Sequence, residues 1–216
     1  MYRIEHEDLP QRVHKVLKRM ILEGELELGQ HLAQDELADR LGVSRTPLLS
    51  ALSKLEREML VETVPRKGSY VRSYSQDELL NIYDIRLRLE PLGARTATEN
   101  GTNAEIQKLS RITDDYEKIV SQGDAGQIKS QDYKFHMLIM EMSRNRFLHN
   151  IVASNNIILI ANVKGLLKGP KESLEQHRSI VSAVQSRDAD AAEEQMYHHI
   201  FTSRAALIHS KPAQHR

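Results

Sequence analysis

Apolar residues recur at helical spacing along most of the chain, and the N-terminal part adds two short runs of a different kind. The spacing predicts helices over residues 9–23, 35–41 and 44–58. Behind them, the runs 60–64 and 69–73 have strand-forming composition and are joined by the basic turn "PRKG". Three helices followed by a hairpin are the layout of a winged helix-turn-helix.

From residue 76 onward the apolar spacing is helical throughout. Ser75 is a suitable N-cap for the first helix there, ahead of Asp77 and Glu78. The predicted fold class is therefore mainly α, with a winged helix-turn-helix domain over residues 1–75 and an all-helical bundle over residues 76–216. The six helices expected in the bundle cover residues 76–99, 103–122, 124–143, 145–167, 171–187 and 188–209.

The composition suits a globular protein and excludes several kinds of site. Of the 216 residues, 40% are hydrophobic and 28% are charged, and none is cysteine, which excludes disulfides and thiolate metal sites. No run approaches the roughly 18–20 apolar residues that span a bilayer, and the N-terminus lacks the apolar core of a signal peptide. We therefore expect a cytoplasmic protein without a membrane partner.

The formal net charge of zero hides an asymmetry within the first 75 residues. Residues 1–39 carry five Lys/Arg and nine Asp/Glu, a net of −4, whereas residues 40–75 carry seven Lys/Arg and three Asp/Glu, a net of +4. Because salt screens charges beyond about 10 Å, the local excess matters more than the sum. The basic stretch holds the predicted third helix and the hairpin, which favours double-stranded DNA as a partner.

The helix predicted over residues 44–58 has one face for the core and one for a partner. Its leucines at i, i+4 and i+7 are expected to pack on the preceding helices. In such domains the N-terminal part of this helix reaches base edges, so Arg45 can bond a guanine or a phosphate and Thr46 a phosphate. The alternative is a solvated face on a purely structural helix. The candidate DNA-binding residues, which include the wing, are Ser44, Arg45, Thr46, Leu49, Ser50, Arg66, Lys67 and Gly68.

These residues carry a family resemblance. The stretch "LADRLGVSRTPLLSALSKLEREMLVETVPRKGSYV" is similar to the DNA-binding domain of the GntR family of bacterial transcription regulators. Leu49 stands where the family usually has a DNA-contacting arginine, Ser50 where it has glutamate, and Met59 where it has glycine. These departures bear on operator sequence and affinity, because Leu49 removes a guanidinium but can still contact a thymine methyl group.

Three of the ten histidines are predicted to face the interior of the helical domain together with one carboxylate. Asp132 and His136 are four residues apart and share a helix face with apolar residues. His177 lies among apolar residues, and His199 faces inward on the last helix, whereas His198 points away. Any one of these alone is more often a core histidine. Together they predict a metal site with nitrogen and oxygen donors, which favours Zn²⁺, Ni²⁺ or Mn²⁺.

The arrangement resembles the helical effector domain, called FCD, of the FadR-type branch of the same family. Its metal-binding members present Asp-x-x-x-His on one helix, then a histidine, then another about one helix later. Asp132, His136, His177 and His199 fall on that pattern. The resemblance implies a divalent metal cofactor, with zinc first. Six helices rather than seven favour the shorter, VanR-like variety of the domain.

Two further residues are candidates for binding an effector. Arg86 lies on an inward helix face, where a guanidinium is costly unless paired. It can form an internal salt bridge, for example with Glu90, or hold the carboxylate of a small organic acid jointly with the metal. Asn145 matches a family position at a helix junction and can equally be a helix cap.

These features predict a transcription regulator and not an enzyme, and the sequence leaves a repressor and an activator both open. Binding of a small organic acid is expected to change the spacing of two DNA-binding heads on an operator with two-fold symmetry. A homodimer is expected because one head makes few phosphate contacts. Two alternatives stay open: a regulator in which the metal ion itself is the effector, and a metal-dependent hydrolase or lyase, for which no obvious general base lies beside the ligands.

Overall fold

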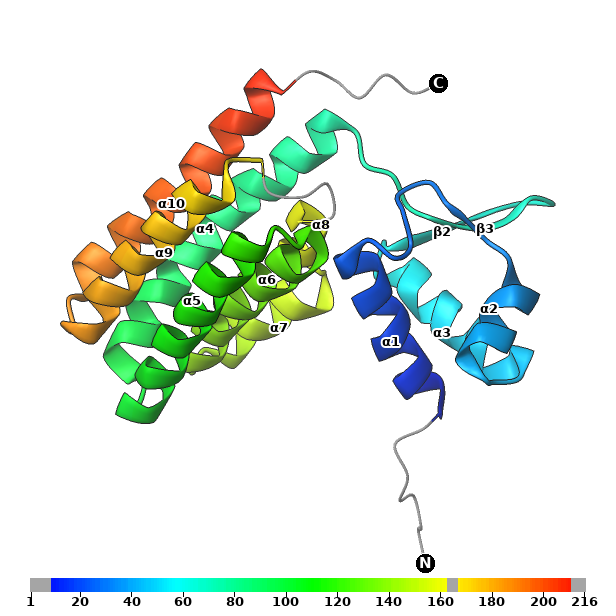
Figure 1. Ribbon diagram of the computed structural model, residues 1–216, viewed down its shortest axis with the longest axis horizontal. Coiled ribbons are helices and arrows are strands. Elements are labelled where there is room, and N and C mark those ends of the chain that lie inside the picture. Colours follow the sequence, from blue (N-terminus) through cyan, green and yellow to red (C-terminus); the bar gives the residue numbers. More distant parts are fainter. Residues whose placement is uncertain (1–8, 163–166, 211–216) are drawn as a thin grey trace, which may run out of the picture. The chain divides into compact units, whose positions relative to one another are not determined.

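The computed structural model describes residues 9–162 and 167–210. The chain divides into two compact units, Met1–Ser73 and Tyr74–Arg216, each of which is described by itself. The division lies two residues before the boundary expected from the sequence. The first unit combines three helices with a small sheet, and the described part of the second unit is all helical (Figure 1). This architecture is the mainly α fold class predicted from the apolar spacing.

The first unit is a helix-turn-helix with a wing. Its helices are packed around buried leucines of the third helix, and the turn between the second and third helices uses Gly42 at φ +64°. Its elements are α1 (Leu9–Glu23), β1 (His31–Leu32), α2 (Gln34–Leu41), α3 (Arg45–Arg57), β2 (Val61–Val64) and β3 (Gly68–Val71).

The sheet of this unit has three antiparallel strands in the order β1-β3-β2. The two longer strands are the hairpin predicted from the sequence, with Val61 opposite Val71 and Val64 opposite Gly68. The first strand was not predicted. It has two residues, too few for an alternating pattern, and it exists because His31 pairs with Tyr70 across the sheet.

Two backbone details of the first unit differ from what local sequence rules favour. Ser44 has the extended backbone of an N-cap, yet its hydroxyl makes no capping hydrogen bond to α3. Met59, which stands at a position where the related family has glycine, adopts φ +60°. Non-glycine residues pay about 1–2 kcal/mol to enter this left-handed region, so the turn between α3 and β2 is strained.

The second unit is a bundle built around the long helix α4. That helix packs against α6, α7, α8, α9 and α10, and α5 packs against α6 and α9. Ser75 caps α4 as predicted: its hydroxyl accepts from the Glu78 amide at 3.1 Å, and the Glu78 carboxylate accepts from the Ser75 amide at 2.8 Å. The helices are α4 (Gln76–Asn100), α5 (Asn103–Gln122), α6 (Ala125–Met142), α7 (Arg146–Ser154), α8 (Ile157–Asn162), α9 (Pro170–Gln185) and α10 (Ala189–His209).

The single helix expected over residues 145–167 is wrong. Asn155 ends α7, and Asn156 adopts φ +51°, a conformation that asparagine enters more readily than most residues. The chain then restarts as α8, so the described part of the second unit holds seven helices rather than six. The helix count that favoured the VanR-like variety is therefore not found. Residues 163–166 of the expected helix lie outside the described residues.

A close approach of α4 to α6 sets the geometry of the bundle interior. A Cβ atom at Gly93 would lie 2.0 Å from Met140 Cε, so this position has room for glycine alone unless Met140 moves. The contact places the inward face of α4, one turn before Gly93, beside the middle of α6. Buried ionisable groups of both helices meet there.

Candidate metal centre and DNA-binding face

The four residues predicted as metal ligands converge in the interior of the helical unit. Asp132 and His136 lie on α6, His177 on α9 and His199 on α10, and none is more than 3% exposed. One donor atom from each residue lies within 4.8 Å of the donor atoms of the others. His198, the neighbour that the helical register excluded, is exposed.

Aromatic packing fixes the orientation of His177. Its ring stacks on Phe135 of α6, with 3.9 Å between ring centroids and 15° between the planes. In this orientation His177 Nε2 lies 3.5 Å from Asp132 Oδ1. The nitrogen is buried and makes no hydrogen bond to any group in the described part of the chain. A buried donor or acceptor without a partner destabilises the folded state by about 1–3 kcal/mol. A ligand bound to this nitrogen would remove that cost.

The other two imidazoles each place one ring nitrogen in the same space. His136 Nδ1 lies 2.6 Å from Glu90 Oε2, so its Nε2 is the nitrogen that remains for the cluster. His199 Nδ1 lies 3.0 Å both from the amide oxygen of Gln176 and from Lys168 Nζ. The two Nε2 atoms lie 3.2 Å apart, a spacing that lets both bind one ion at about 2.0–2.1 Å.

The charge states of the histidines also suit metal binding. Burial lowers the pKa of His177 and of His199 well below its ordinary value, and the nearby Lys168 lowers both further. Both side chains are therefore neutral near pH 7, and the neutral imidazole is the form that coordinates metals. Three imidazole nitrogens and one carboxylate oxygen, without thiolates, form a donor set that fits Zn²⁺, Ni²⁺ or Mn²⁺.

The predicted carboxylate ligand is itself held in place. Asn162 of α8 donates to Asp132 Oδ2 at 2.7 Å, and the Ser173 hydroxyl lies 3.5 Å from Asp132 Oδ1. Hydrogen bonds of this kind orient metal-binding carboxylates in known sites. The Asn162 contact was not foreseen, because α8 was expected to be the end of a longer helix with another register.

Arg86 forms the internal salt bridge that the sequence left open. Its guanidinium bonds the carboxylate of Glu90 one turn along α4, and both side chains are almost fully buried. Burial by itself would raise the pKa of Glu90, but the charge of Arg86 and the hydrogen bond from His136 lower it to about 2. Glu90 is therefore ionised and joins Arg86 to a predicted metal ligand.

Lys168 is a second buried cation beside the cluster, and sequence reasoning missed it. Its ammonium donates to the amide oxygen of Gln176, to His199 O at 2.7 Å and to Thr202 Oγ1 at 3.0 Å. Burial lowers its pKa to about 7, while the charges of nearby carboxylates act in the opposite direction. The side chain sits just before α9, and no periodic pattern marked it as buried.

A small cavity adjoins the cluster. Its volume of about 10 Å³ has room for roughly one water molecule. Both buried cations line it, next to two of the predicted ligands. Its lining comprises Tyr83, Arg86, Asp132, Asn162, Leu167, Lys168, Ser173, His199 and Ser203.

Asn145 is not brought to this cavity. Its side chain caps α7 by accepting from the Leu148 amide at 3.0 Å. It lines a separate open cleft of about 520 Å³ with Arg144, Arg146 and His149. The structure thus places Asn145 in the capping role, which was the alternative interpretation of the sequence.

In the first unit, α3 presents the side chains expected to meet DNA. Leu48, Leu52 and Leu55 are buried, and Leu49 on the other side is 45% exposed. Arg45 is exposed and pairs with Asp35 of α2. The remaining candidates on the helix, Ser44, Thr46 and Ser50, are also exposed.

The β2–β3 hairpin forms the wing, which extends beyond the helices of its unit (Figure 1). Arg66 and Lys67 are exposed at its tip, and Arg66 has φ +64°. Gly68 has φ +97°, and a Cβ atom there would lie 2.8 Å from His31 Nε2. The tight turn thus requires glycine and keeps both basic side chains together at one end of the wing.

Each of the two units matches the model of a known protein family. Residues 9–71 match the model of the "Bacterial regulatory proteins, gntR family", and residues 81–202 match the FCD domain. The chain belongs to the GntR family, in the FadR-type branch that carries an FCD domain. It is a DNA-binding transcription regulator and not an enzyme.

Relatives of similar length support this assignment. An uncharacterized HTH-type transcriptional regulator, YdhC, of Bacillus subtilis is 29% identical over 85% of this chain and 84% of its own. The HTH-type transcriptional repressor RspR of Escherichia coli is 27% identical over 88% of this chain and 85% of its own. The E. coli McbR/YncC structure shares the fold, with a TM-score of 0.84 at 22% identity over 94% of this chain and 98% of that chain.

None of the helices in residues 9–162 and 167–210 is long and apolar enough to cross a membrane.

We expect Leu49→Arg to raise the affinity of the regulator for DNA and to steepen its salt dependence. The exposed position at the start of α3 lets a guanidinium reach a phosphate, and each added phosphate contact raises the slope of log K against log salt by about 0.9. Fluorescence anisotropy with labelled DNA over a salt series measures both quantities. Ile151→Arg, at a similarly exposed apolar position on α7, controls for added charge. An unchanged slope for Leu49→Arg would show that α3 does not meet DNA through this face.

Proposed function

We propose that the protein is a dimeric repressor that binds a two-fold symmetric operator in the cytoplasm and responds to a small organic acid near a metal ion in its helical domain. Repression is supported by the relatives, since RspR of E. coli is named a repressor. The observation that supports the metal site is His177 Nε2, a buried nitrogen that has no hydrogen-bond partner among the described residues and lies 3.5 Å from Asp132 Oδ1. We propose zinc as the ion, with nickel or manganese as alternatives.

The four donors Asp132, His136, His177 and His199 would hold the ion. When bound, a divalent ion supplies positive charge and an open coordination position for a carboxylate. The rest of the site belongs to the chain itself. Glu90 contacts His136 Nδ1, and Gln176 contacts His199 Nδ1. Contacts of this kind, behind the ligands, orient metal-binding histidines.

Two buried cations support an acidic effector. Arg86 and Lys168 line the cavity together with Asp132 and His199. Glu90 engages one side of the Arg86 guanidinium, and a guanidinium carries five N–H donors in all. A carboxylate that entered the cavity would find N–H donors on Arg86 and Lys168, and charge-assisted hydrogen bonds to it are about twice as strong as neutral ones.

An acid must displace side chains to enter, because the cavity has room for roughly one water molecule. Lys168 is the side chain best placed to move, since it contacts His199 and Thr202 of α10. Its movement would release α10 from the segment before α9. Effector binding is thereby coupled to the position of α10.

A hydrogen bond connects α10 to the start of α4. Gln76 Nε2, at the first residue of α4, donates to Leu207 O at 2.7 Å. Leu207 lies two turns beyond His199 on the same helix, and Gln76 follows directly on the segment that joins the two units. A shift of α10 therefore moves Gln76, which directly follows the segment joining the two units. Effector binding can in this way alter operator binding.

A second candidate has support from the size of the cavity. A volume of about 10 Å³ suits a coordinated water better than an organic acid. In that case the metal ion itself is the effector, and the buried cations tune its affinity. The DNA-binding function is the same in both cases.

The test is a binding titration with DNA from upstream of the protein's own gene, repeated over a series of salt concentrations. Three samples are compared: metal-free protein, zinc-loaded protein, and zinc-loaded protein with a panel of small mono- and dicarboxylic acids. We expect salt-dependent binding that at least one acid weakens by about 5–150-fold in the presence of zinc. If zinc changes the affinity and no acid does, the ion is the effector. Absent or salt-insensitive binding by dimeric protein contradicts the proposal.

A further inference from the structure

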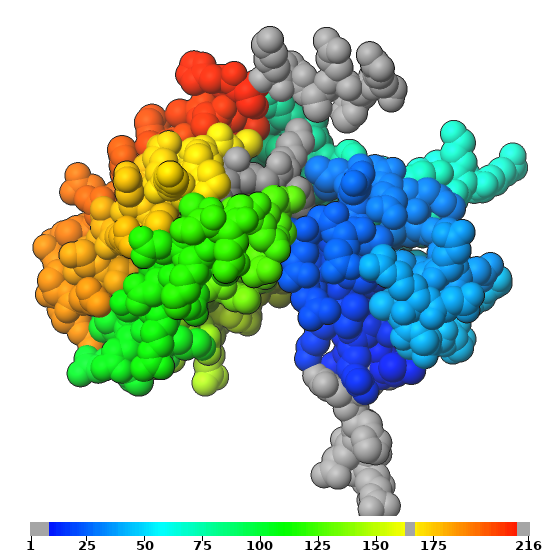
Figure 2. Space-filling model, viewed as in Figure 1, coloured from blue at the N-terminus to red at the C-terminus, as the bar shows by residue number. Residues whose placement is uncertain are grey.

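An ion pair on the DNA-binding face joins α2 to α3. Arg45, the first residue of α3, bonds the carboxylate of Asp35 through its Nη2 atom, and Asp35 lies in the first turn of α2. The two helices pack against each other (Figure 1), and Figure 2 shows α2, in a lighter blue than α1, at the surface of its unit. Both partners stand on helices, which position side chains more precisely than loops do.

This ion pair adds little to the stability of the fold. The side chain of Arg45 is 68% exposed and that of Asp35 is 66% exposed, and water and salt screen a pair of this kind. Arg45 also lies at the positive end of the α3 helix dipole, a position that favours anions over cations. The property that the pair can change is therefore the contact between α3 and DNA.

Arg45 is the only charged side chain among the α3 residues expected to meet DNA. The others are Ser44, Thr46, Leu49 and Ser50. Because none of them is charged, any charge-assisted hydrogen bond from this set to DNA must come from Arg45. A residue that controls the direction of this guanidinium therefore controls an important part of the sequence readout by α3.

The contact with Asp35 leaves Arg45 able to bind the edge of a base. A guanidinium carries five N–H donors in one plane, and the bond to Asp35 engages Nη2. The donors that remain still include two on one edge, which the O6 and N7 acceptors of guanine require. The carboxylate also restricts the rotation of the guanidinium, so less conformational freedom is lost when Arg45 binds DNA.

The negative charge of Asp35 favours a base over a phosphate as the partner of Arg45. If Arg45 bound a phosphate while it kept its contact with Asp35, two anions would lie on one guanidinium and repel each other. The edge of guanine is uncharged and causes no such repulsion. Asp35 can in addition accept a hydrogen bond from the N4 amino group of a cytosine in the major groove.

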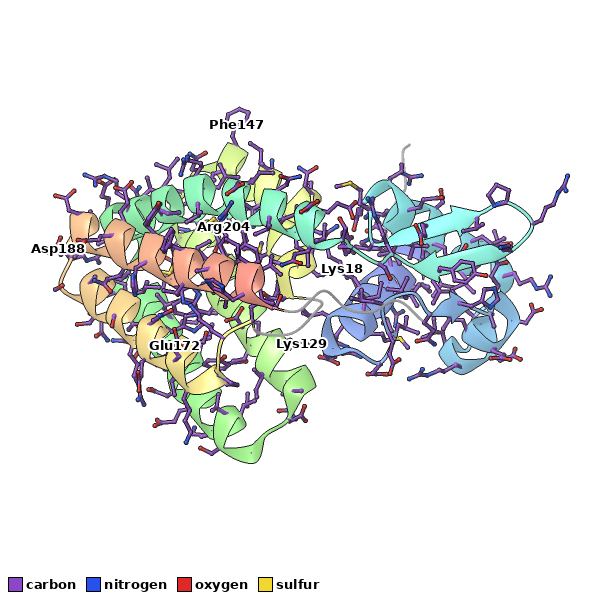
Figure 3. The ribbon with its side chains drawn as sticks, turned by 90° about the horizontal axis from the view of Figure 1, so that it is seen from above. Lys18, Lys129, Phe147, Glu172, Asp188 and Arg204 are labelled. Carbon is purple, nitrogen blue, oxygen red and sulfur yellow. The ribbon has the colours of Figure 1, made fainter. Side chains whose placement is uncertain are left out.

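We propose that Asp35 is a positioning residue that directs Arg45 to a guanine in the major groove and away from the phosphate backbone. This role goes beyond the proposed function and rests only on DNA binding, since it involves neither the effector nor the metal. Phosphate contacts are then left to other cations, such as Arg66 and Lys67 of the wing, from which side chains extend into solvent (Figure 3).

The test uses an operator that the wild-type protein selects from a library of random DNA duplexes. Each G·C pair of one half-site is replaced in turn by A·T, and fluorescence anisotropy gives the affinity of the wild type and of Asp35→Ala for every duplex. We expect one G·C pair whose replacement weakens binding of the wild type by about 5–150-fold, the discrimination typical of a bidentate contact. In Asp35→Ala the same replacement is expected to have at most about one-fifth of that effect.

A second readout is the binding of a duplex of alternating A·T pairs, which contains no guanine. Asp35→Ala is expected to bind this duplex more tightly than the wild type, because Arg45 becomes free to reach a phosphate. The slope of log K against log salt steepens by about 0.9 for each arginine released. Glu36→Ala is the matched control, since it removes the same charge from the neighbouring exposed position of α2. It is expected to keep both the G·C preference and the slope.

Asp35→Asn, which keeps an uncharged acceptor oxygen, replaces Asp35→Ala if that variant does not fold, and circular dichroism checks each protein. A folded Asp35 variant that keeps the full G·C preference overturns the proposed role. A Glu36→Ala protein that loses the preference to the same extent, or a wild type that selects no G·C pair, overturns it as well. If the selected duplex behaves as expected and DNA from upstream of the protein's own gene is not bound, the proposed operator is refuted and the role of Asp35 stands.

Discussion

His177→Ala is expected to abolish the rise in melting temperature that zinc gives to the wild-type protein. A ligand that binds only the folded state stabilises it by about 4 kcal/mol at a concentration of 1,000 times its Kd. His177 contributes a buried nitrogen that no group in residues 9–162 or 167–210 satisfies, and its ring is held by stacking on Phe135. Without it, one of the four donors is missing and zinc affinity falls. Thermal unfolding followed by circular dichroism, with zinc and with a chelator, gives the difference.

The control for this experiment is His198→Ala. His198 is exposed and lies next to His199 in the chain, so it tests whether the loss of any histidine near the site has the same effect. It is expected to leave the zinc-dependent shift unchanged. If His177→Ala keeps the full shift, the four converging residues are a buried polar network and zinc binds elsewhere.

Glu90→Ala is expected to destabilise the helical unit by about 3–5 kcal/mol, because removing one partner leaves an uncompensated buried charge. That charge is Arg86, which is almost fully buried and bonds Glu90. The same substitution removes the acceptor for His136 Nδ1 and is expected to lower zinc affinity by about 10–100-fold. Urea unfolding measures the stability, and a competition titration with a chelator measures the affinity.

The chain offers a matched control for this variant on the same helix. Glu99 pairs with Arg95 at the same i, i+4 spacing, but on the surface of α4. Glu99→Ala is expected to change stability far less, because water and salt screen an exposed pair. The double variant Arg86→Leu/Glu90→Ala is expected to recover part of the loss. Equal losses for Glu90→Ala and Glu99→Ala would show that the buried pair has no special role.

The convergence of the four proposed metal ligands could be predicted because helical spacing carries the necessary information. Asp132 and His136 are four apart, and His177 and His199 lie at apolar positions of their helices, so their inward direction followed from periodicity. The same reasoning separated His199 from His198. Periodicity gives the direction in which a side chain points. Several donor side chains that point into the interior of one small bundle must lie close to one another.

The surroundings of those ligands could not be predicted in the same way. Lys168 lies between helices, where no period applies, and its burial depends on how that segment returns to α10. Glu90 was recognised as a partner for Arg86, but its contact with His136 requires the close approach of α4 and α6 at Gly93. These contacts join residues that are distant in sequence, and local patterns do not determine them.

The break between α7 and α8 had a local signal that was overlooked. Asn155 and Asn156 are adjacent, and asparagine tolerates the left-handed conformation that ends a helix. Strongly apolar residues on both sides favoured a single helix. The double asparagine was the better guide, and it also positions Asn162 to bond Asp132.

The central claim is that a dimeric DNA-binding regulator carries a metal ion at Asp132, His136, His177 and His199. Native mass spectrometry of the protein, purified without chelator and exposed to zinc, tests this most directly. The account predicts the mass of two chains with one divalent ion each, and the loss of both ions without loss of the dimer in His177→Ala. A wild-type dimer without metal, or a His177→Ala dimer that keeps its ions, would contradict it.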